Sequence, residues 1–207
     1  MTVSLVWATP DAERLIVKMA RVSNPANEDN WETGPNLIKY LIKHKHWSPL
    51  EMACMCLKIE TERDISAQIL RHRTFTFQEF STRYAKSARA EVPWFRRQDT
   101  KNRQNSFADI HPTRQDTYQR QASYVIGQAF SLYDQMLQDG VAKETARRIL
   151  PLCTGTTLYM QGTLRSWVHY IALRASEDTQ LEHRRIAIAC KEVFKQQFPS
   201  IAEAAFE

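Results

Sequence analysis

The chain has 207 residues, of which 43% are hydrophobic and 25% charged, and its formal net charge is +5. This length suits one globular domain with a sizeable core, and the composition, with only five glycines, excludes the disordered and fibrous classes. The longest apolar run, residues 52–57, is far shorter than the roughly 20 residues of a membrane-spanning helix, so no membrane partner is expected.

The first residues, MTVSLVWATPD, lack the basic and apolar segments of a secretory leader, and a cytoplasmic location is therefore expected. The four cysteines form no CxxC pair. Disulfides and a metal site are consequently not expected.

The predicted elements, in chain order, mix helices and strands irregularly. A strand is expected at residues 3–7, and a helix begins near Pro10 and Asp11. Further helices are predicted at 36–44, 64–71, 113–138, 143–150, 164–175 and 179–198, and further strands at 52–60 and 156–160. Gly140 ends the long fourth helix, and residues 93–112 are predicted to form a long polar loop. This order predicts an α+β fold, a sheet with packed helices in a single domain, residues 1–207.

The positive charge is concentrated in residues 83–120, which contain nine Lys or Arg residues against four acidic ones. This excess equals the net charge of the whole chain, so the rest of the chain is neutral. Such a segment indicates either an anionic partner or a solvated loop.

The densest polar cluster is Arg71-His72-Arg73, whose three side chains repel one another unless an anion lies among them. Gln68 and Arg71 are three residues apart on a predicted helix face, and Glu79 and Arg83 are four apart. Each pair is suited to binding one ligand, and the alternative for each is a surface salt bridge or a solvated helix end.

The predicted helix 164–175 carries Arg174 on one side of its apolar face and Arg165 and His169 on the other. A half-buried arginine needs an anionic or carbonyl partner, so this helix is suited to contacting two ligands or two subunits. The alternatives are a solvent-reaching Arg174 and a core hydrogen bond for His169. For Arg147, the alternative to a ligand contact is a salt bridge with Glu144.

The segment RHRTFTFQEFSTRY, an RHR triplet followed after seven residues by Ser81, resembles the signature of flavin-dependent thymidylate synthases. Four more segments share the resemblance: ARVS (20–23), HWSPLE (46–51), ARRILP (146–151) and LRSWVHYIALRAS (164–176). The resemblance implies an enzyme that methylates dUMP to dTMP, with the methylene taken from 5,10-methylenetetrahydrofolate and the hydride from NADPH through FAD. It also implies a homotetramer with active sites at subunit interfaces, and no nucleic-acid partner.

Site residues carried over from this resemblance fall into two sets. The dUMP set is Gln68, Ile69, Leu70, Arg71, Glu79, Phe80, Ser81, Thr82, Arg83, Arg147 and Arg174. The FAD set is Ser23, His46, Ser48, Arg71, His72, Arg73, Glu79, Thr163, Arg165 and His169. Arg174 matches the arginine that polarises the uracil, and is the predicted catalytic residue. Ser81 is interpreted as a hydroxyl that positions dUMP, because no base is assigned to activate it.

Two features depart from the family pattern. Thr163 stands where asparagine is frequent, which removes or changes one flavin hydrogen bond, and Thr76 replaces a serine while keeping the hydroxyl. An inactive homologue therefore remains one alternative. The other is a nucleic-acid binder in which the RHR triplet and the basic segment contact phosphates while Phe75, Phe77 and Phe80 stack on bases.

Overall fold

The computed structural model describes residues 1–87, 90–103 and 105–207, and the chain forms two compact units within them. Unit 1 comprises residues 1–59, 70–78 and 159–207, and unit 2 comprises residues 60–69 and 79–158. The α+β class predicted from the sequence is confirmed. One family domain over the whole chain stays a prediction. None of the described helices is both long and apolar enough to cross a membrane.

The main sheet has four strands in the order β1-β2-β6-β3. Their bounds are β1 (Thr2–Ala8), β2 (Cys54–Glu62), β6 (Gly155–Thr163) and β3 (Thr76–Glu79). The strand β2 alternates buried and half-buried residues along most of its length, as expected of a central strand. The chain passes from one unit to the other within β2, β3 and β6.

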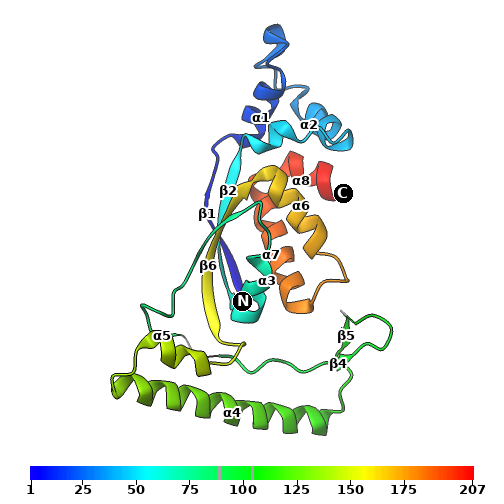
Figure 1. Cartoon of the computed structure of the whole chain (residues 1–207). Helices are drawn as coiled ribbons and strands as arrows, with labels where there is room; N and C mark the ends of the chain where they lie inside the picture. The colour runs from blue at the N-terminus through cyan, green and yellow to red at the C-terminus, as the bar shows by residue number, and fades with distance from the viewer. Residues whose placement is uncertain (88–89, 104) are drawn as a thin grey trace. The chain divides into compact units, whose positions relative to one another are not determined.

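In unit 1, helices bury the apolar residues of the sheet. These helices are α1 (Ala12–Ala20), α2 (Gly34–Lys43), α6 (Leu164–Arg174), α7 (Leu181–Gln197) and α8 (Pro199–Phe206), with the short 3-10 helices η1 (Pro25–Asn27) and η2 (Ser48–Glu51). The helix α7 packs against β1, α6 and α8, and Figure 1 shows α6, α7 and α8 together on one side of the strands. Trp167 is fully buried in this core, and its Nε1–H donates to the Met55 carbonyl at 3.0 Å, so its polar atom is satisfied.

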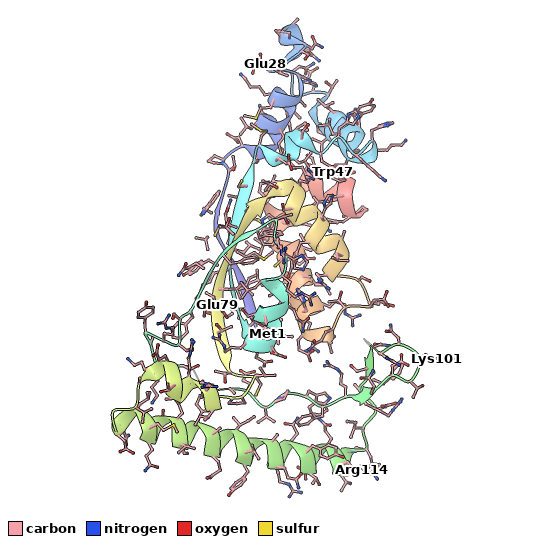
Figure 2. All side chains as sticks on the ribbon, viewed as in Figure 1. Met1, Glu28, Trp47, Glu79, Lys101 and Arg114 are labelled. Atoms are coloured by element: carbon pink, nitrogen blue, oxygen red, sulfur yellow. The ribbon has the colours of Figure 1, made fainter. Side chains whose placement is uncertain are left out.

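Unit 2 is built around a long helix. Its elements are α3 (Arg63–Ile69), β4 (Arg97–Gln98), β5 (Ser106–Phe107), α4 (Pro112–Gln138), α5 (Lys143–Ala146) and the 3-10 helix η3 (Arg147–Ile149). His111 caps the start of α4, and Gly140, at φ 82°, follows its end. The strands β4 and β5 pair antiparallel, and Figure 2 labels Lys101 in the loop between them.

Several sequence expectations differ from this structure. The predicted loop 93–112 contains the β4–β5 hairpin, whose two-residue strands are too short to give a hydrophobic period. The strand β3 and the helix α8 were missed. The predicted helix 143–150 is instead α5 followed by η3, and the helix predicted to reach Arg71 ends at Ile69. The end of α4 near Gly140 is confirmed.

Gly162 lies in β6 beside the Phe75 ring, and a Cβ atom added there meets Cδ1 and Cε1 of that ring at 2.5 and 2.7 Å. Because Phe75 is buried and packs edge-on against Trp167, it cannot move freely. Gly162→Ala is therefore expected to lower the free energy of unfolding by about 1–3 kcal/mol, measured by urea denaturation.

Gly127 provides the matched control, because it lies inside α4 and an added Cβ atom meets nothing within 4 Å. Gly127→Ala is expected to be neutral or to stabilise by up to about 1 kcal/mol, since alanine favours helix. If the two substitutions changed the free energy of unfolding equally, the Phe75 ring would have to move aside without an energetic penalty, which would contradict the prediction.

Candidate active site

A cavity of about 260 Å³ opens in unit 1 where α6 begins and where the RHR triplet ends. Its lining residues are Glu51, His72, Thr74, Phe75, Arg165, Ser166, His169, Tyr170 and Leu173. Three of the residues predicted to bind FAD, His72, Arg165 and His169, are thus brought to one cavity. The apolar wall of Phe75 and Leu173 beside these donors is typical of a small-molecule site.

Thr163, the departure from the family pattern, caps the helix that carries this wall. Its Oγ1 accepts a hydrogen bond from the Ser166 backbone N at 3.3 Å, and it lies 3.1 Å from the Ser166 hydroxyl. A threonine at this position satisfies one of the unpaired N–H groups at the start of α6. The side chain therefore orients the first turn of α6, where Arg165 lies.

At the mouth of the cavity, Arg165 Nη1 contacts Glu51 Oε1 at 2.7 Å, with both side chains almost half exposed. The His169 ring packs edge-on against Trp47, with ring centroids 4.6 Å apart. Burial, and secondarily the charge of Arg165, lowers the pKa of His169. The neutral imidazole is therefore the dominant form of His169 at neutral pH.

His72 connects the cavity to Arg174. The Nε–H of Arg174 donates to His72 Nε2 at 3.0 Å, which requires Nε2 to be unprotonated and the ring proton to lie on Nδ1. Burial, then the charges of Arg174 and Arg71, lowers the pKa of His72 to about 4. None of the described residues accepts a hydrogen bond from the two Nη groups of Arg174. This bond therefore fixes a guanidinium whose Nη groups are available to a ligand.

In unit 2, Glu79 is held by two hydroxyl groups. Ser66 Oγ and Thr156 Oγ1 donate to Glu79 Oε1 at 2.8 and 3.0 Å, and Arg63 Nη1 lies 4.0 Å from the same oxygen. The Glu79 side chain is only 20% exposed. These two donors fix the orientation of the Glu79 carboxyl group, and among the described residues none donates a hydrogen bond to its Oε2.

A second polar group in unit 2 contains four residues of the predicted dUMP set, three that follow Glu79 closely in sequence and Arg147. Arg147 Nη1 donates to the buried Thr82 hydroxyl at 3.2 Å, and Arg83 Nη2 contacts Glu144 Oε2 at 3.3 Å. The Ser81 hydroxyl accepts from the Arg83 backbone N at 3.4 Å. The salt bridge expected between Arg147 and Glu144 as the alternative is wrong, because Glu144 pairs with Arg83 and η3 turns Arg147 towards Thr82.

Two pairings predicted from helical spacing are wrong. Gln68 and Arg71 do not share a helix face, because α3 ends at Ile69 and Arg71 lies in the following turn. Glu79 ends β3 and Arg83 lies in a turn, so their spacing of four has no helical meaning. Strand pairing to β6, which the spacing cannot reveal, determines the partners of Glu79.

The remaining predicted residues are dispersed. Arg71, Arg73, Leu70 and Phe80 are exposed, whereas the Ile69 side chain is fully buried, which leaves only its backbone for a ligand. Ser48 begins η2, which packs against α6. Neither Ser23, exposed beyond α1, nor His46, whose ring packs against Tyr40, lines the cavity.

Sequence reasoning missed other residues of both groups. Glu51 lies within the quoted HWSPLE segment, and Tyr170 is one helical turn before Arg174, so both could have been found by position. Ser66 and Thr156 carry no comparable signal, because each approaches Glu79 only through the fold.

Four of the eight described Lys and Arg residues of the basic segment form ion pairs with acidic residues. Ion pairs join Arg83 to Glu144, Lys86 to Asp134, Arg97 to Asp109 and Arg120 to Asp116. Arg89 lies outside the described residues. This pairing favours the solvated-loop interpretation over a surface for nucleic-acid phosphates. In the described part of the chain, no group of three or more His, Cys, Asp or Glu residues is arranged to hold a metal ion.

The α+β fold and these fixed cationic and hydroxyl groups are typical of one class of protein, an enzyme that binds an anionic ligand. The comparison with known sequences identifies the family. Residues 4–200 match the family described as thymidylate synthase complementing protein, and the chain belongs to this family of flavin-dependent thymidylate synthases. The family resemblance predicted from the RHR signature is thereby confirmed, and with it the enzyme class.

Two individual relatives and one solved structure show the same similarity. A probable flavin-dependent thymidylate synthase of Paramecium bursaria Chlorella virus 1 is 50% identical over 205 residues, covering 99% of this chain and 95% of the viral protein. The flavin-dependent thymidylate synthase of a Synechocystis species is 46% identical, covering 93% of this chain and 88% of that one. The crystal structure of a UMP/dUMP methylase from Streptomyces cacaoi, bound with 5-Br dUMP, superposes with a TM-score of 0.86 at 27% identity, covering 98% of this chain and 93% of that one.

Proposed function

We propose that this chain converts dUMP to dTMP, taking the methylene from 5,10-methylenetetrahydrofolate and the reducing hydride from NADPH. Membership of the family supports the reaction. The observation that carries the proposal in this chain is Arg174, fixed by a neutral His72 with both Nη groups available. The cytoplasmic location stays a prediction from the sequence.

Arg174 supplies the electrostatic contribution. A guanidinium fixed beside a uracil carbonyl stabilises negative charge that develops on the ring, and this makes C5 more nucleophilic. His72 orients Arg174 by accepting a hydrogen bond from its Nε–H, which leaves the two Nη groups for the ligand. This needs a neutral His72, because a protonated imidazole would repel the guanidinium and could not accept the bond. We assign Arg174 as the catalytic residue and His72 as the group that orients it.

The remaining dUMP contacts are assigned to the residues carried over from the signature. Arg147, already oriented by Thr82, is suited to a phosphate oxygen, and the Glu79 Oε2 atom is an acceptor for an N–H group of the ligand. Ser81 adds a hydroxyl. We assign further backbone and side-chain contacts to residues Gln68 to Arg71 and Phe80 to Arg83, as the family resemblance implies.

FAD fits the donor set of unit 1 and supplies hydride transfer when bound. His72, Arg165 and His169 face the cavity, and the cation of Arg165 suits a diphosphate. At about 260 Å³, however, the cavity is smaller than the roughly 300–1,000 Å³ that small-molecule ligands fill. We infer that one chain provides only part of the FAD site, and that a second copy completes it within a homotetramer.

An apolar stripe along α4 supports this assembly. Tyr118, Val125 and Leu132 are seven residues apart and remain 44%, 63% and 47% exposed. With Ala122, Ala129 and Met136 they alternate at spacings of four and three, the period of a helix that packs against another helix. A second copy of this chain is the occupant we propose, because the incomplete FAD cavity requires one.

The double substitution Val125→Glu, Leu132→Glu is expected to convert the tetramer to a smaller species, because charge placed in an apolar helix contact is costly. Size-exclusion chromatography with light scattering measures the mass. Ser131→Glu, an exposed change on the opposite side of α4, is the control and should leave the tetramer intact. A wild-type protein that is monomeric at micromolar concentration would contradict the assembly.

The reaction itself is tested by incubating the FAD-loaded protein with dUMP, methylenetetrahydrofolate and NADPH, and by quantifying dTMP chromatographically. We expect dTMP only when all components are present. Protein that retains FAD and its tetramer but forms no dTMP would instead favour the inactive homologue.

A further inference from the structure

A buried polar pair lies against His72 in unit 1, and neither of its two residues belongs to the sets assigned to dUMP and FAD. Tyr170 of α6 and His183 of α7 are 1% and 0% exposed, and the Tyr170 hydroxyl lies 3.1 Å from His183 Nε2. The signature does not contain His183, which is nine residues beyond Arg174 on a separate helix. Burying two such groups is costly unless they satisfy each other, and this hydrogen bond does so.

The pair contacts His72 directly. The His72 and Tyr170 rings pack edge-to-face with centroids 4.9 Å apart at 86°, and the His72 and His183 centroids are 6.2 Å apart. On its other sides, the Tyr170 ring packs against Phe75 and Trp167, each with centroids 5.8 Å away. The Tyr170 ring is therefore fixed at both its edge and its hydroxyl, and it forms a rigid wall for the imidazole of His72.

We propose that Tyr170 and His183 are positioning residues that hold His72 in the orientation and tautomer in which its Nε2 accepts from Arg174. This inference rests on the proposed function, because it concerns how the catalytic guanidinium is oriented. Neither residue needs to touch substrate. Their effect passes through the ring contact with His72 and through the hydrogen bond between His72 and Arg174.

The protonation states support this arrangement. Burial, and secondarily Cys190, raises the pKa of Tyr170 well above its ordinary value, so the phenol keeps its proton and donates it. Burial, then Arg174 and His72, lowers the pKa of His183 to about 4, so its ring is neutral, and in the tautomer with the proton on Nδ1 its Nε2 accepts from the Tyr170 hydroxyl. Because the Tyr170 hydroxyl occupies this atom, His183 does not compete with His72 for the Nε–H of Arg174.

The test uses the FAD-loaded protein labelled with ¹⁵N-histidine. Long-range ¹H–¹⁵N spectra report the tautomer and titration of His72, and dTMP formation is measured on the same samples. In wild type we expect one tautomer with an unprotonated Nε2. In Tyr170→Phe and His183→Leu we expect mixed His72 tautomers and a His72 titration at higher pH. We also expect kcat to fall by about 10- to 100-fold, since a misplacement of about 1 Å near the reacting groups can lower the rate by about 10²-fold.

His183→Gln is expected to restore most of the wild-type spectrum, because its amide reaches the position of Nε2. Tyr133→Phe is the matched control: it removes a hydroxyl from another fully buried tyrosine, in unit 2, and should leave His72 and kcat unchanged. Unchanged His72 spectra and kcat in both Tyr170→Phe and His183→Leu, with only thermal stability reduced, would overturn the proposal. The spectra need no turnover, so a protein that makes no dTMP would contradict the proposed function while the His72 tautomer still decides this inference.

Discussion

Arg174→Ala is expected to lower kcat for dTMP formation by about 10²–10³-fold, the usual effect of removing one fixed donor that stabilises transition-state charge. FAD binding and the tetramer should persist, because Arg174 is not among the cavity-lining residues and lies far along the chain from the α4 stripe. Steady-state kinetics, the visible spectrum and the mass in solution measure these three properties on one preparation.

Arg174→Lys is expected to recover only part of the lost rate, since an ammonium lacks the planar fork of the guanidinium. In Arg174→Ala the pKa of His72 should also rise, because the charge of Arg174 is one of its causes, although burial is the larger one. Turnover equal to wild type in the alanine variant would remove Arg174 from the mechanism.

Acidification is expected to destabilise the protein markedly between pH 6.5 and 4. His72 and His183 both have pKa values lowered from 6.5 to about 4, mainly by burial. Above pH 6.5 the two histidines are neutral in both the folded and the unfolded chain, and the contribution of these two groups to the free energy of unfolding is fully present. As the pH falls from 6.5 towards 4, the unfolded chain binds protons that the folded chain does not, so the stability is lost. Each histidine contributes up to about 3 kcal/mol, and His72 less because it is partly exposed.

Urea denaturation at a series of pH values between 7.5 and 4.5 measures this loss as a fall in the free energy of unfolding. His183→Gln should flatten the dependence, because glutamine does not titrate. The hairpin carboxylates do not interfere: hydrogen bonds, from the Lys101 backbone to Asp99 and from Arg97 to Asp109, lower the pKa of each carboxyl. They therefore titrate at lower pH. A free energy of unfolding that is constant from pH 7 to 5 would contradict the assignment of two buried neutral histidines.

The sequence predicted elements and residues that depend on local pattern. The end of α4 near Gly140 follows from the need for a positive φ after a helix, and the buried positions Leu164, Trp167, Val168 and Ile171 of α6 follow from its period. The position of Arg174 beside this apolar face was likewise predicted, and the structure adds its partner, His72.

What the sequence could not predict depends on packing between distant segments. The Tyr170–His183 bond exists because α7 packs against α6, and Glu79 meets Ser66 and Thr156 because the chain pairs β3 with β6. The sequence placed Arg174 on one side of α6 and Arg165 and His169 on the other, but it could not show that the two sides share a contact. His72 lines the cavity of Arg165 and His169 and accepts from Arg174, so one residue joins both sides.

The visible absorbance spectrum of the purified protein, before and after addition of dUMP, tests most directly whether this chain holds flavin and nucleotide in one site. The account predicts the bands of oxidised flavin, and a shift of those bands that saturates with dUMP. A colourless protein that takes up no added FAD, or flavin bands that dUMP leaves unchanged, would contradict it.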